Sequence, residues 1–255
     1  MSSIARLTQS DAALFASDMH LGDHDPETAA LFLSTLQAQA ASITHLFLLG
    51  DIFEAWVGDD QPDQVAAALG ESLRGLARRG VHVALMRGNR DFLLGSGPPG
   101  LTWPERFGAT LLDDLIVVDL FGERVLLAHG DIWCTDDHDY QRFRAEVRTE
   151  AWQRGFLARP LAERLAIALT MRAQSERNKQ GQDMGDVNEE AVRAALRAAG
   201  VRQLIHGHTH RPGCYPLGGG LERRVLPDWL AAAGRGGVLR VDQSGTRALP
   251  LGAAR

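Results

Sequence analysis

Residues 45–51 read HLFLLGD, an apolar run that stops at a glycine followed by an aspartate. Two similar runs, Ala12 to Ala16 and Val81 to Met86, are also followed by polar clusters. The stretches between the runs, Pro26 to Ala41 and Pro62 to Arg79, are helical in character. This alternation predicts a β-α-β-α-β unit with a parallel sheet and right-handed crossovers.

The pattern changes in the second half of the chain. From Leu111 to Ala128 the sequence predicts two strands that form a hairpin around Phe121-Gly122, with no helix between them. A helical stretch follows at Asp139 to Ala199, and a further strand at Val201 to Ile205. Hairpin signals bounded by glycines then occur at Leu217 to Leu221 and at Gly236 to Leu249. The fold class expected from these elements is α/β, in one domain with an insertion.

Composition narrows the class of protein. The chain has 255 residues and a net charge of -5, which excludes a generally basic surface, so no nucleic-acid partner is expected. Cys134 and Cys214 have no paired ligand spacing and are too few for a disulfide framework, as is typical of a cytoplasmic protein. No stretch reaches the roughly 18 apolar residues of a spanning helix. Any contact with a membrane is therefore expected to be peripheral.

Five polar clusters of the metal-ligand type each follow a predicted strand. They are Asp18-Met-His20, Gly50-Asp51, Gly88-Asn89-Arg90-Asp91, His129-Gly-Asp131 and Gly207-His208-Thr-His210. The carboxyl ends of strands in an open α/β sheet converge on one crevice, so we expect the clusters to meet at a single sheet edge. One such cluster alone is more often a simple turn, and a lone histidine is more often structural than a ligand. Five clusters in order make coincidence improbable.

The donor types indicate which ions the clusters would hold. Carboxylates, an amide oxygen and imidazoles suit divalent Mn, Fe or Zn, and the absence of thiolates argues against a structural zinc site. Two ions roughly 3.5 to 4 Å apart would hold a bridging hydroxide and neutralise phosphoryl oxygens during an in-line displacement. Asp51 is the expected carboxylate shared by the two ions.

The five clusters together resemble the five motifs of the calcineurin-like metallophosphoesterases. This resemblance implies a four-layer α/β/β/α sandwich formed by residues 1–255, with a helical lid insertion at about 137–190. It implies that Asp18, His20, Asp51 and His210 bind one metal, and that Asp51, Asn89, His129 and His208 bind the other. It also implies a catalytic group made of Asp51, Asn89, Arg90 and His129.

Longer segments look like a narrower family, the UDP-2,3-diacylglucosamine pyrophosphatases of lipid A biosynthesis. They are SDMHLG, LLGDIFEAWVGDD, MRGNRDFLLG, LLAHGDIWCTDDHDYQRFR and HGHTHRP, within roughly residues 17 to 213. The resemblance implies two Mn²⁺ ions and release of UMP and 2,3-diacylglucosamine 1-phosphate after attack on the α-phosphorus. It implies a lipid-linked sugar nucleotide as substrate and a position at the cytoplasmic face of the inner membrane. A monomer is expected.

The third motif of this chain is Gly-Asn-Arg90, where many monoesterases of the superfamily have Gly-Asn-His. A histidine can protonate a poor alkoxide leaving group, whereas the phosphate monoester expelled from a pyrophosphate has a second pKa of about 6 and leaves without a general acid. Arg90 offers a fixed fork of donors and a permanent charge to the additional phosphate. We therefore interpret Arg90 as a substrate clamp.

The helical stretch differs in charge from the rest of the chain. Residues 142–179 carry nine basic and four acidic side chains, a balance of +5, together with an apolar stripe that includes Trp152, Phe156 and Leu169. The simpler reading is an amphipathic helix pair with a solvated basic face. With the motifs present, we favour a lid whose apolar side shelters lipid chains and whose basic side meets anionic headgroups.

The resemblance also implies substrate contacts, from Asn89, Arg90, Asp137, Arg172, Ser175, Lys179 and His208. Asn178 and Gln182 are further candidates, because the stretch before Asp186 is shorter than is usual in the family. The family often has a histidine soon after His-Arg-Pro, where this chain has Cys214-Tyr215, a departure that concerns local support more than the metals.

Two alternatives remain open. One is another calcineurin-like phosphodiesterase or nucleotide pyrophosphatase, acting for instance on dinucleoside polyphosphates or cyclic nucleotides. The other is a degenerate phosphoesterase fold used only as a binding scaffold, which would not need all seven ligands.

Overall fold

The computed structural model describes residues 6–8, 11–179 and 185–251, and the side chains of residues 173–179 lie outside the described part. Its strands form two six-stranded sheets. The predicted β-α-β-α-β unit lies in one of them, hereafter the first sheet, and the predicted hairpin around Phe121-Gly122 lies in the second sheet.

The first sheet has the order β12-β11-β2-β3-β4-β5. Its strands are β2 (Ala12–Ala16), β3 (His45–Leu49), β4 (His82–Met86), β5 (Ala109–Leu111), β11 (Gly237–Asp242) and β12 (Gly245–Pro250). Strands β2 to β5 are parallel, and β11 and β12 close the other side as an antiparallel hairpin. The predicted parallel unit is confirmed.

The second sheet has the order β1-β6-β7-β8-β10-β9. Its strands are β1 (Arg6–Leu7), β6 (Leu115–Leu120), β7 (Glu123–Ala128), β8 (Gln203–His206), β9 (Gly213–Gly218) and β10 (Leu221–Val225). Strands β7, β8 and β10 run parallel to one another. The second sheet therefore also brings strand ends to one side of the molecule.

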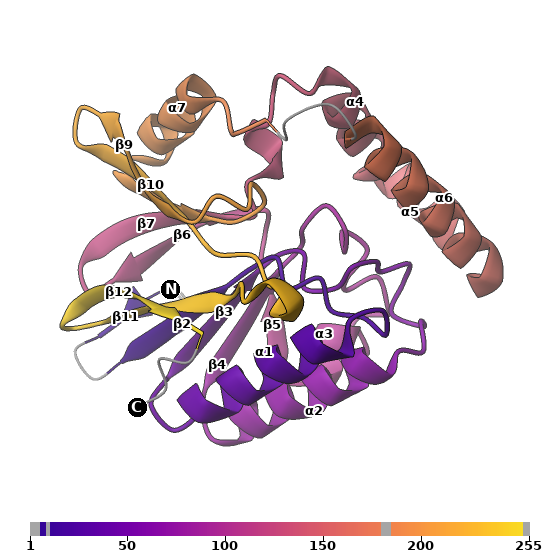
Figure 1. The fold of residues 1–255 in the computed structure, drawn as a ribbon, viewed down its shortest axis with the longest axis horizontal. Helices are drawn as coiled ribbons and strands as arrows, with labels where there is room; N and C mark the ends of the chain where they lie inside the picture. Colours follow the sequence, from indigo (N-terminus) through magenta and orange to yellow (C-terminus); the bar gives the residue numbers. More distant parts are fainter. Residues whose placement is uncertain (1–5, 9–10, 180–184, 252–255) are drawn as a thin grey trace.

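Helices complete the outer layers of the sandwich. Helices α1 (Pro26–Gln39) and α2 (Gln64–Arg78) cover the first sheet, and α7 (Glu189–Ala199) covers the second (Figure 1). Each begins with a side chain that accepts from a backbone N–H of its first turn: Asp25, Asp63 and Asn188. The order of layers is α/β/β/α, which confirms the predicted architecture.

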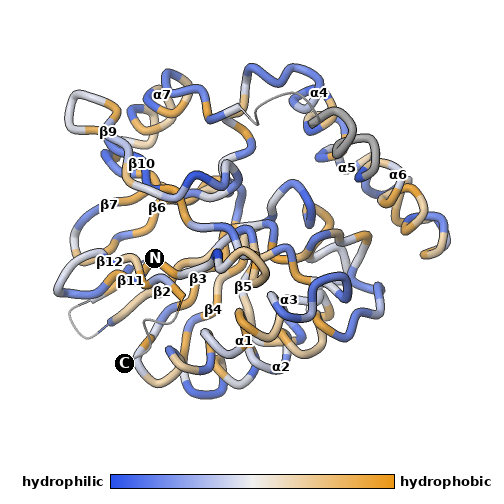
Figure 2. Tube along the Cα trace, viewed as in Figure 1, coloured by the Kyte–Doolittle hydropathy of each residue, from blue (hydrophilic) through white to orange (hydrophobic). Residues whose placement is uncertain are grey.

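The core between the sheets is aromatic and aliphatic. Phe15 of β2 and Phe47 of β3 stack with ring centroids 4.8 Å apart and pack with Val118, Val125 and other residues of the second sheet. Both rings are fully buried. Figure 2 shows hydrophobic residues along the central strands and mixed colouring along the covering helices. Burying each such ring contributes about 1.5–3 kcal/mol.

Three helices project beside the sandwich (Figure 1): α4 (His138–Val147), α5 (Glu150–Leu157) and α6 (Leu161–Lys179). They lie within the expected insertion, whereas α7 packs on the second sheet. The two ends of the insertion lie side by side, because Asn188 N–H donates to the Trp133 carbonyl at 2.7 Å.

The insertion is fixed to the sandwich at several points. Arg164 of α6 is buried, donates to the Val57 carbonyl at 2.6 Å and pairs with Asp60. Phe156 of α5 joins the core that lies under the first sheet's helices. The short helices α3 (Trp103–Arg106), η2 (Asp131–Trp133) and η3 (Ala231–Ala233) lie in connecting segments.

Replacing Phe47 tests the core between the sheets. Phe47→Ala should lower the free energy of unfolding by about 3–5 kcal/mol, because it removes a buried ring and leaves a cavity. Urea denaturation followed by circular dichroism measures this change. Leu101→Ala, at a leucine that is 63% exposed, is the control and should change stability by less than about 0.5 kcal/mol. Equal effects of the two substitutions would contradict this description of the core.

Candidate dinuclear metal centre

The five predicted polar clusters lie at the carboxyl ends of five strands. Three follow β2, β3 and β4 of the first sheet, and two follow β7 and β8 of the second. The expectation of a single sheet edge is therefore wrong: the strand ends of both sheets meet at one side of the sandwich. Within each sheet the ends are joined by backbone bonds, since Gly207 N–H donates to the His129 carbonyl at 2.8 Å and Asp18 N–H donates to the Gly50 carbonyl at 3.1 Å. Between the sheets, His208 N–H donates to Asp18 Oδ2 at 2.9 Å.

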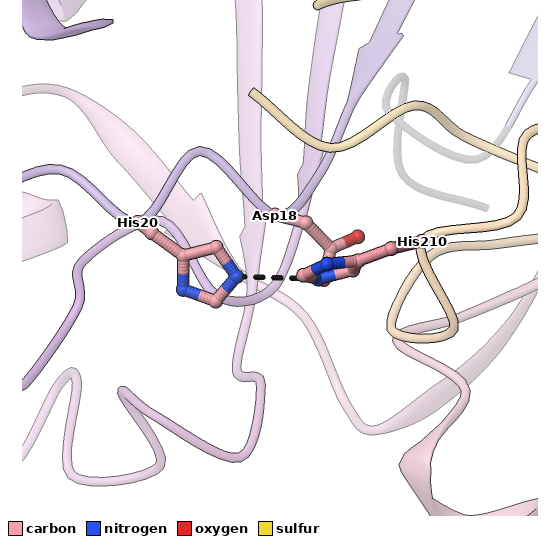
Figure 3. A group of neighbouring side chains, drawn as sticks. All are labelled: Asp18, His20 and His210. Carbon is pink, nitrogen blue, oxygen red and sulfur yellow. Dashed lines mark hydrogen bonds and ion pairs between the residues drawn. The ribbon is translucent and has the colours of Figure 1, made fainter. Parts of the chain in front are cut away.

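The first ligand group consists of Asp18, His20 and His210, whose donor atoms lie within 4.8 Å of one another (Figure 3). His20 Nε2 is 3.4 Å from His210 Nε2, and His210 Nε2 is 3.6 Å from Asp18 Oδ1. Asp51 Oδ2 approaches His20 Nε2 at 3.9 Å. The four residues predicted for one metal thus face one another.

The second group surrounds Asn89. Its Oδ1 atom is 2.9 Å from His129 Nε2 and 2.8 Å from His208 Nδ1. Asp51 Oδ1 lies 3.6 Å from His129 Nε2, so the two oxygens of Asp51 face different groups. Donor atoms of Asp18, Asp51 and His129 also lie within 4.8 Å of one another. The sharing of Asp51 between two ions stays a prediction, and this arrangement allows it.

The backbone at these positions is unusual. Five of the six non-glycine residues with positive φ in the described chain belong to the seven expected ligands: Asp18, His20, Asp51, His208 and His210. Such a conformation costs of order 1 kcal/mol or more for each residue and persists only where the surrounding structure imposes it. Because the strain coincides with the ligands, it indicates a functional site.

Acceptors lie beside Nδ1 of three of the four imidazole rings, on the side away from the centre, whereas His208 turns its Nδ1 toward Asn89. His129 Nδ1 lies 2.9 Å from the Leu49 carbonyl. Carboxylates lie beside Nδ1 of His20 and His210, with Glu54 at 3.1 Å from His20 and Asp228 at 3.6 Å from His210. An acceptor at Nδ1 leaves Nε2 without a proton and able to bind a cation. The donor set therefore fits two divalent ions.

Burial and charge are balanced within the centre. Burial alone would raise the pKa of Asp18, but His210 and His129 outweigh this effect and hold that pKa well below its usual range. Burial likewise opposes protonation of His129, yet Asp51 and Asp18 raise its pKa to about 9. Burial, together with the charge of His129, lowers the pKa of His208 to about 4. A bound cation would displace the protons that these groups hold.

Four supporting carboxylates have no assigned role in the sequence-based ligand set. Buried Asp91 accepts from Gly88 N–H and Ile52 N–H, both at 2.7 Å, and so joins two motif loops. Asp131 pairs with Arg144 at 2.7 Å. The motif clusters already contain Asp91 and Asp131, whereas Glu54 and Asp228 act across long sequence separations. No local pattern signals Asp228.

The expected substrate residues occupy different surroundings. Arg90 lies beside the centre, its N–H donating to Asp51 Oδ1 at 2.8 Å, and Arg172 Nε reaches Glu54 at 3.1 Å. Asp137 is exposed and caps α4 by accepting from Tyr140 N–H at 2.9 Å. Its predicted contact with substrate therefore stays a prediction. The side chains of Ser175, Asn178 and Lys179, and all of Gln182, lie outside the described part.

Comparison with known proteins agrees with this geometry. Residues 13–212 match the family model described as calcineurin-like phosphoesterase. The chain belongs to the calcineurin-like phosphoesterase family. A cold-active protein tyrosine phosphatase structure shares this fold with a TM-score of 0.51 at 13% identity, covering 98% of this chain and 79% of that one. At that identity the likeness shows the fold alone.

Several curated proteins are much more similar to this chain in sequence. A protein of Chromobacterium violaceum named UDP-2,3-diacylglucosamine hydrolase is 50% identical, covering 93% of this chain and 98% of the relative. Proteins of the same name from Bordetella pertussis and Stenotrophomonas maltophilia are 46% and 44% identical, and each alignment covers more than nine-tenths of both chains.

Gly88 tests how closely the motif loops pack. A Cβ at Gly88 would lie 2.1 Å from Asp51 Oδ1 and 2.3 Å from Asp51 N, so Gly88→Ala must displace the shared carboxylate. We expect metal affinity and activity to fall by at least about tenfold.

Gly75→Ala in α2 is the control: its Cβ would meet no atom within 4 Å, so stability should rise by about 0.5–1 kcal/mol with activity unchanged. Isothermal titration with Mn²⁺ and thermal melts measure both. Retention of wild-type metal affinity by Gly88→Ala would show that Asp51 does not bridge the site.

Asp51 itself tests the number of ions. Asp51→Ala should reduce bound divalent metal from about two ions per chain to one or fewer, because both ions lose the same ligand. Elemental analysis of the dialysed protein measures the content. Glu71→Ala, at an exposed helical position, is the control and should keep both ions. Unchanged metal content in folded Asp51→Ala would rule out the assigned site.

Proposed function

We propose that this protein hydrolyses the pyrophosphate bond of UDP-2,3-diacylglucosamine, releasing UMP and 2,3-diacylglucosamine 1-phosphate in lipid A biosynthesis. The observation that carries the proposal is the meeting of all seven expected ligands at one end of the sandwich. The names of relatives that are 43–50% identical over nearly the whole chain support this substrate.

The seven ligand residues would hold two divalent ions, with Mn²⁺ as the proposed metal, which would supply an activated water for attack on the α-phosphorus and neutralise charge on the phosphoryl oxygens. The chain holds the ligands of both ions in place before substrate binds. Asp51 gives one oxygen to each group, and Asn89 contributes its amide oxygen between two imidazoles. This pre-organisation reduces the cost of reaching the reactive geometry.

Arg90 fits the role of a clamp for the second phosphate. Its backbone N–H donates to Asp51 Oδ1, so the Arg90 side chain begins directly beside the metal centre. The guanidinium remains charged and presents a planar fork that matches phosphate oxygens. The leaving phosphate monoester needs no general acid, and an arginine at this position is consistent with cleavage of a phosphoanhydride.

The three projecting helices are proposed to form the lid. Leu165 and Leu169 of α6 are exposed at 37% and 66%, and they continue the apolar side that includes Ile167 and Ala168. We propose that this apolar side holds the acyl chains and that the basic side chains face anionic lipid headgroups. No described helix is both long enough and apolar enough to cross a membrane. The proposed location is the cytoplasmic face of the inner membrane, with the protein a monomer.

The proposed substrate contacts combine the centre and the lid. Asn89, Arg90 and His208 would contact the phosphates, while Asp137, Arg172, Ser175 and Lys179 would contact the sugar and lipid part. Of the lid residues, Arg172 has the clearest support, because its side chain pairs with Glu54, which lies beside the metal centre.

Product analysis tests the proposal directly. Purified protein with Mn²⁺ and UDP-2,3-diacylglucosamine should release UMP, detected by anion-exchange chromatography. Release of UDP, or no turnover, would reject the proposal. The deacylated sugar nucleotide distinguishes this proposal from the main alternative, another phosphodiesterase of the family. An enzyme that uses the acyl chains for catalysis should lose about 100-fold or more of kcat/KM when the substrate lacks them. Equal rates would favour another phosphodiesterase of the family.

A further inference from the structure

Glu54 lies outside the set of metal ligands but against it. It follows β3 in the loop that begins at Asp51, and its N–H donates to the Leu21 carbonyl at 3.0 Å. A parallel bridge between Leu21 and Phe53 fixes this loop to the loop that carries His20. The Glu54 side chain is only 12% exposed. Its carboxylate therefore has a defined place beside the centre.

The two oxygens of Glu54 contact three separate parts of the chain. Oε2 lies 3.1 Å from His20 Nδ1. Oε1 lies 3.1 Å from Arg172 Nε and 3.7 Å from Arg90 Nη1. His20 is an expected metal ligand, Arg172 belongs to α6, and Arg90 follows β4. One carboxylate thus connects the centre, the projecting helices and the phosphate clamp.

The contact with His20 determines which ring nitrogen faces the centre. His20 Nε2 points toward His210 and Asp51, as Figure 3 shows for His210. For Nε2 to bind a cation, the ring proton must be on Nδ1. Nδ1 is buried and is not aligned for a hydrogen bond with any described group, so the nearby Glu54 oxygen is the acceptor that a small ring rotation would engage. A carboxylate there favours the metal-binding tautomer.

The contact with the two arginines has a different consequence. Arg90 and Arg172 both approach the same oxygen, so two permanent positive charges lie close together. Without a carboxylate between them, like-charge repulsion would drive the side chains apart. A guanidinium has five N–H donors, so it can contact a carboxylate and a phosphate group at the same time.

We propose that Glu54 is a positioning residue that couples α6 to the metal centre, holding His20 in its metal-binding tautomer with one oxygen and Arg90 and Arg172 together with the other. The arginine half of this coupling rests on the proposed function, because it assigns the arginines to a diphosphate substrate. The histidine half depends only on metal binding.

The first experiment uses Mn²⁺ alone and needs no substrate. Isothermal titration of Glu54→Ala should show Mn²⁺ affinity reduced by about 10–100-fold. Glu54→Gln keeps an acceptor oxygen and should recover part of this loss. Glu71→Gln, at an exposed helical glutamate, is the matched control and should bind Mn²⁺ as the wild type does. Wild-type affinity in a folded Glu54→Ala protein would overturn the histidine half of the proposal.

The second experiment follows the docking of α6 without substrate. Hydrogen exchange of Glu54→Gln should show lost amide protection near Arg172, while the beginning of α6, held by buried Arg164, keeps its protection. Arg172→Ala should cause the same local loss while leaving Mn²⁺ affinity unchanged. Unchanged protection in Glu54→Gln would overturn the coupling to α6. A simple loss of stability would instead increase exchange along the whole helix.

Kinetics then connect the coupling to the reaction. With UDP-2,3-diacylglucosamine, Glu54→Gln and Arg172→Ala should each raise KM more than they lower kcat, and the double variant should be no worse than the more affected single variant. Additive effects on KM would overturn the shared role of the arginines. If the wild type does not turn over this substrate, the proposed function fails, and the Mn²⁺ and exchange experiments still decide the role of Glu54.

Discussion

Burial of two carboxylates among imidazoles is the constraint on which this structure depends. Asp18 and Asp51 are almost completely removed from solvent, and their oxygens lie within a few ångströms of His129. Such burial is costly unless each charge is matched. Backbone N–H groups of His208 and Arg90 donate to these carboxylates, and the imidazoles supply opposite charge. The strained backbone at the ligands is held by the hydrogen bonds that join the loops.

The two-sheet core makes this constraint possible. The stacked rings of Phe15 and Phe47 lie in the strands that end two residues before Asp18 and Asp51. Packing between the sheets therefore fixes the positions at which β2 and β3 end relative to β7 and β8. The projecting helices add a further connection, because Arg148, directly after α4, donates to the Gly88 carbonyl at 2.9 Å, next to Asn89. Sheet packing and this hydrogen bond therefore both hold the loops of the centre in place.

Local patterns in the sequence were enough to predict most of the strands, the two covering helices of the first sheet and a set of seven candidate ligands that the fold brings together. Each of these features depends on a short stretch of sequence, such as HLFLLGD or Gly207-His208-Thr-His210. The division of the clusters between two sheets was missed, because strand order depends on contacts such as β7 beside β8, where Val125 pairs with Gln203, 78 positions further along the chain. Glu54 and Asp228 were missed for the same reason, since their roles arise only when distant loops meet. The insertion was expected to end at about residue 190, and α7, which begins at Glu189, packs on the second sheet.

The joined base of the insertion has an evolutionary consequence. Asn188 and Trp133 are hydrogen bonded where the chain leaves and re-enters the sandwich. A segment with neighbouring ends can be lengthened, shortened or exchanged without moving either sheet. Selection could thus remodel the insertion while the residues at the strand ends stay constant. This modularity offers a route by which one phosphoesterase scaffold acquires new substrates.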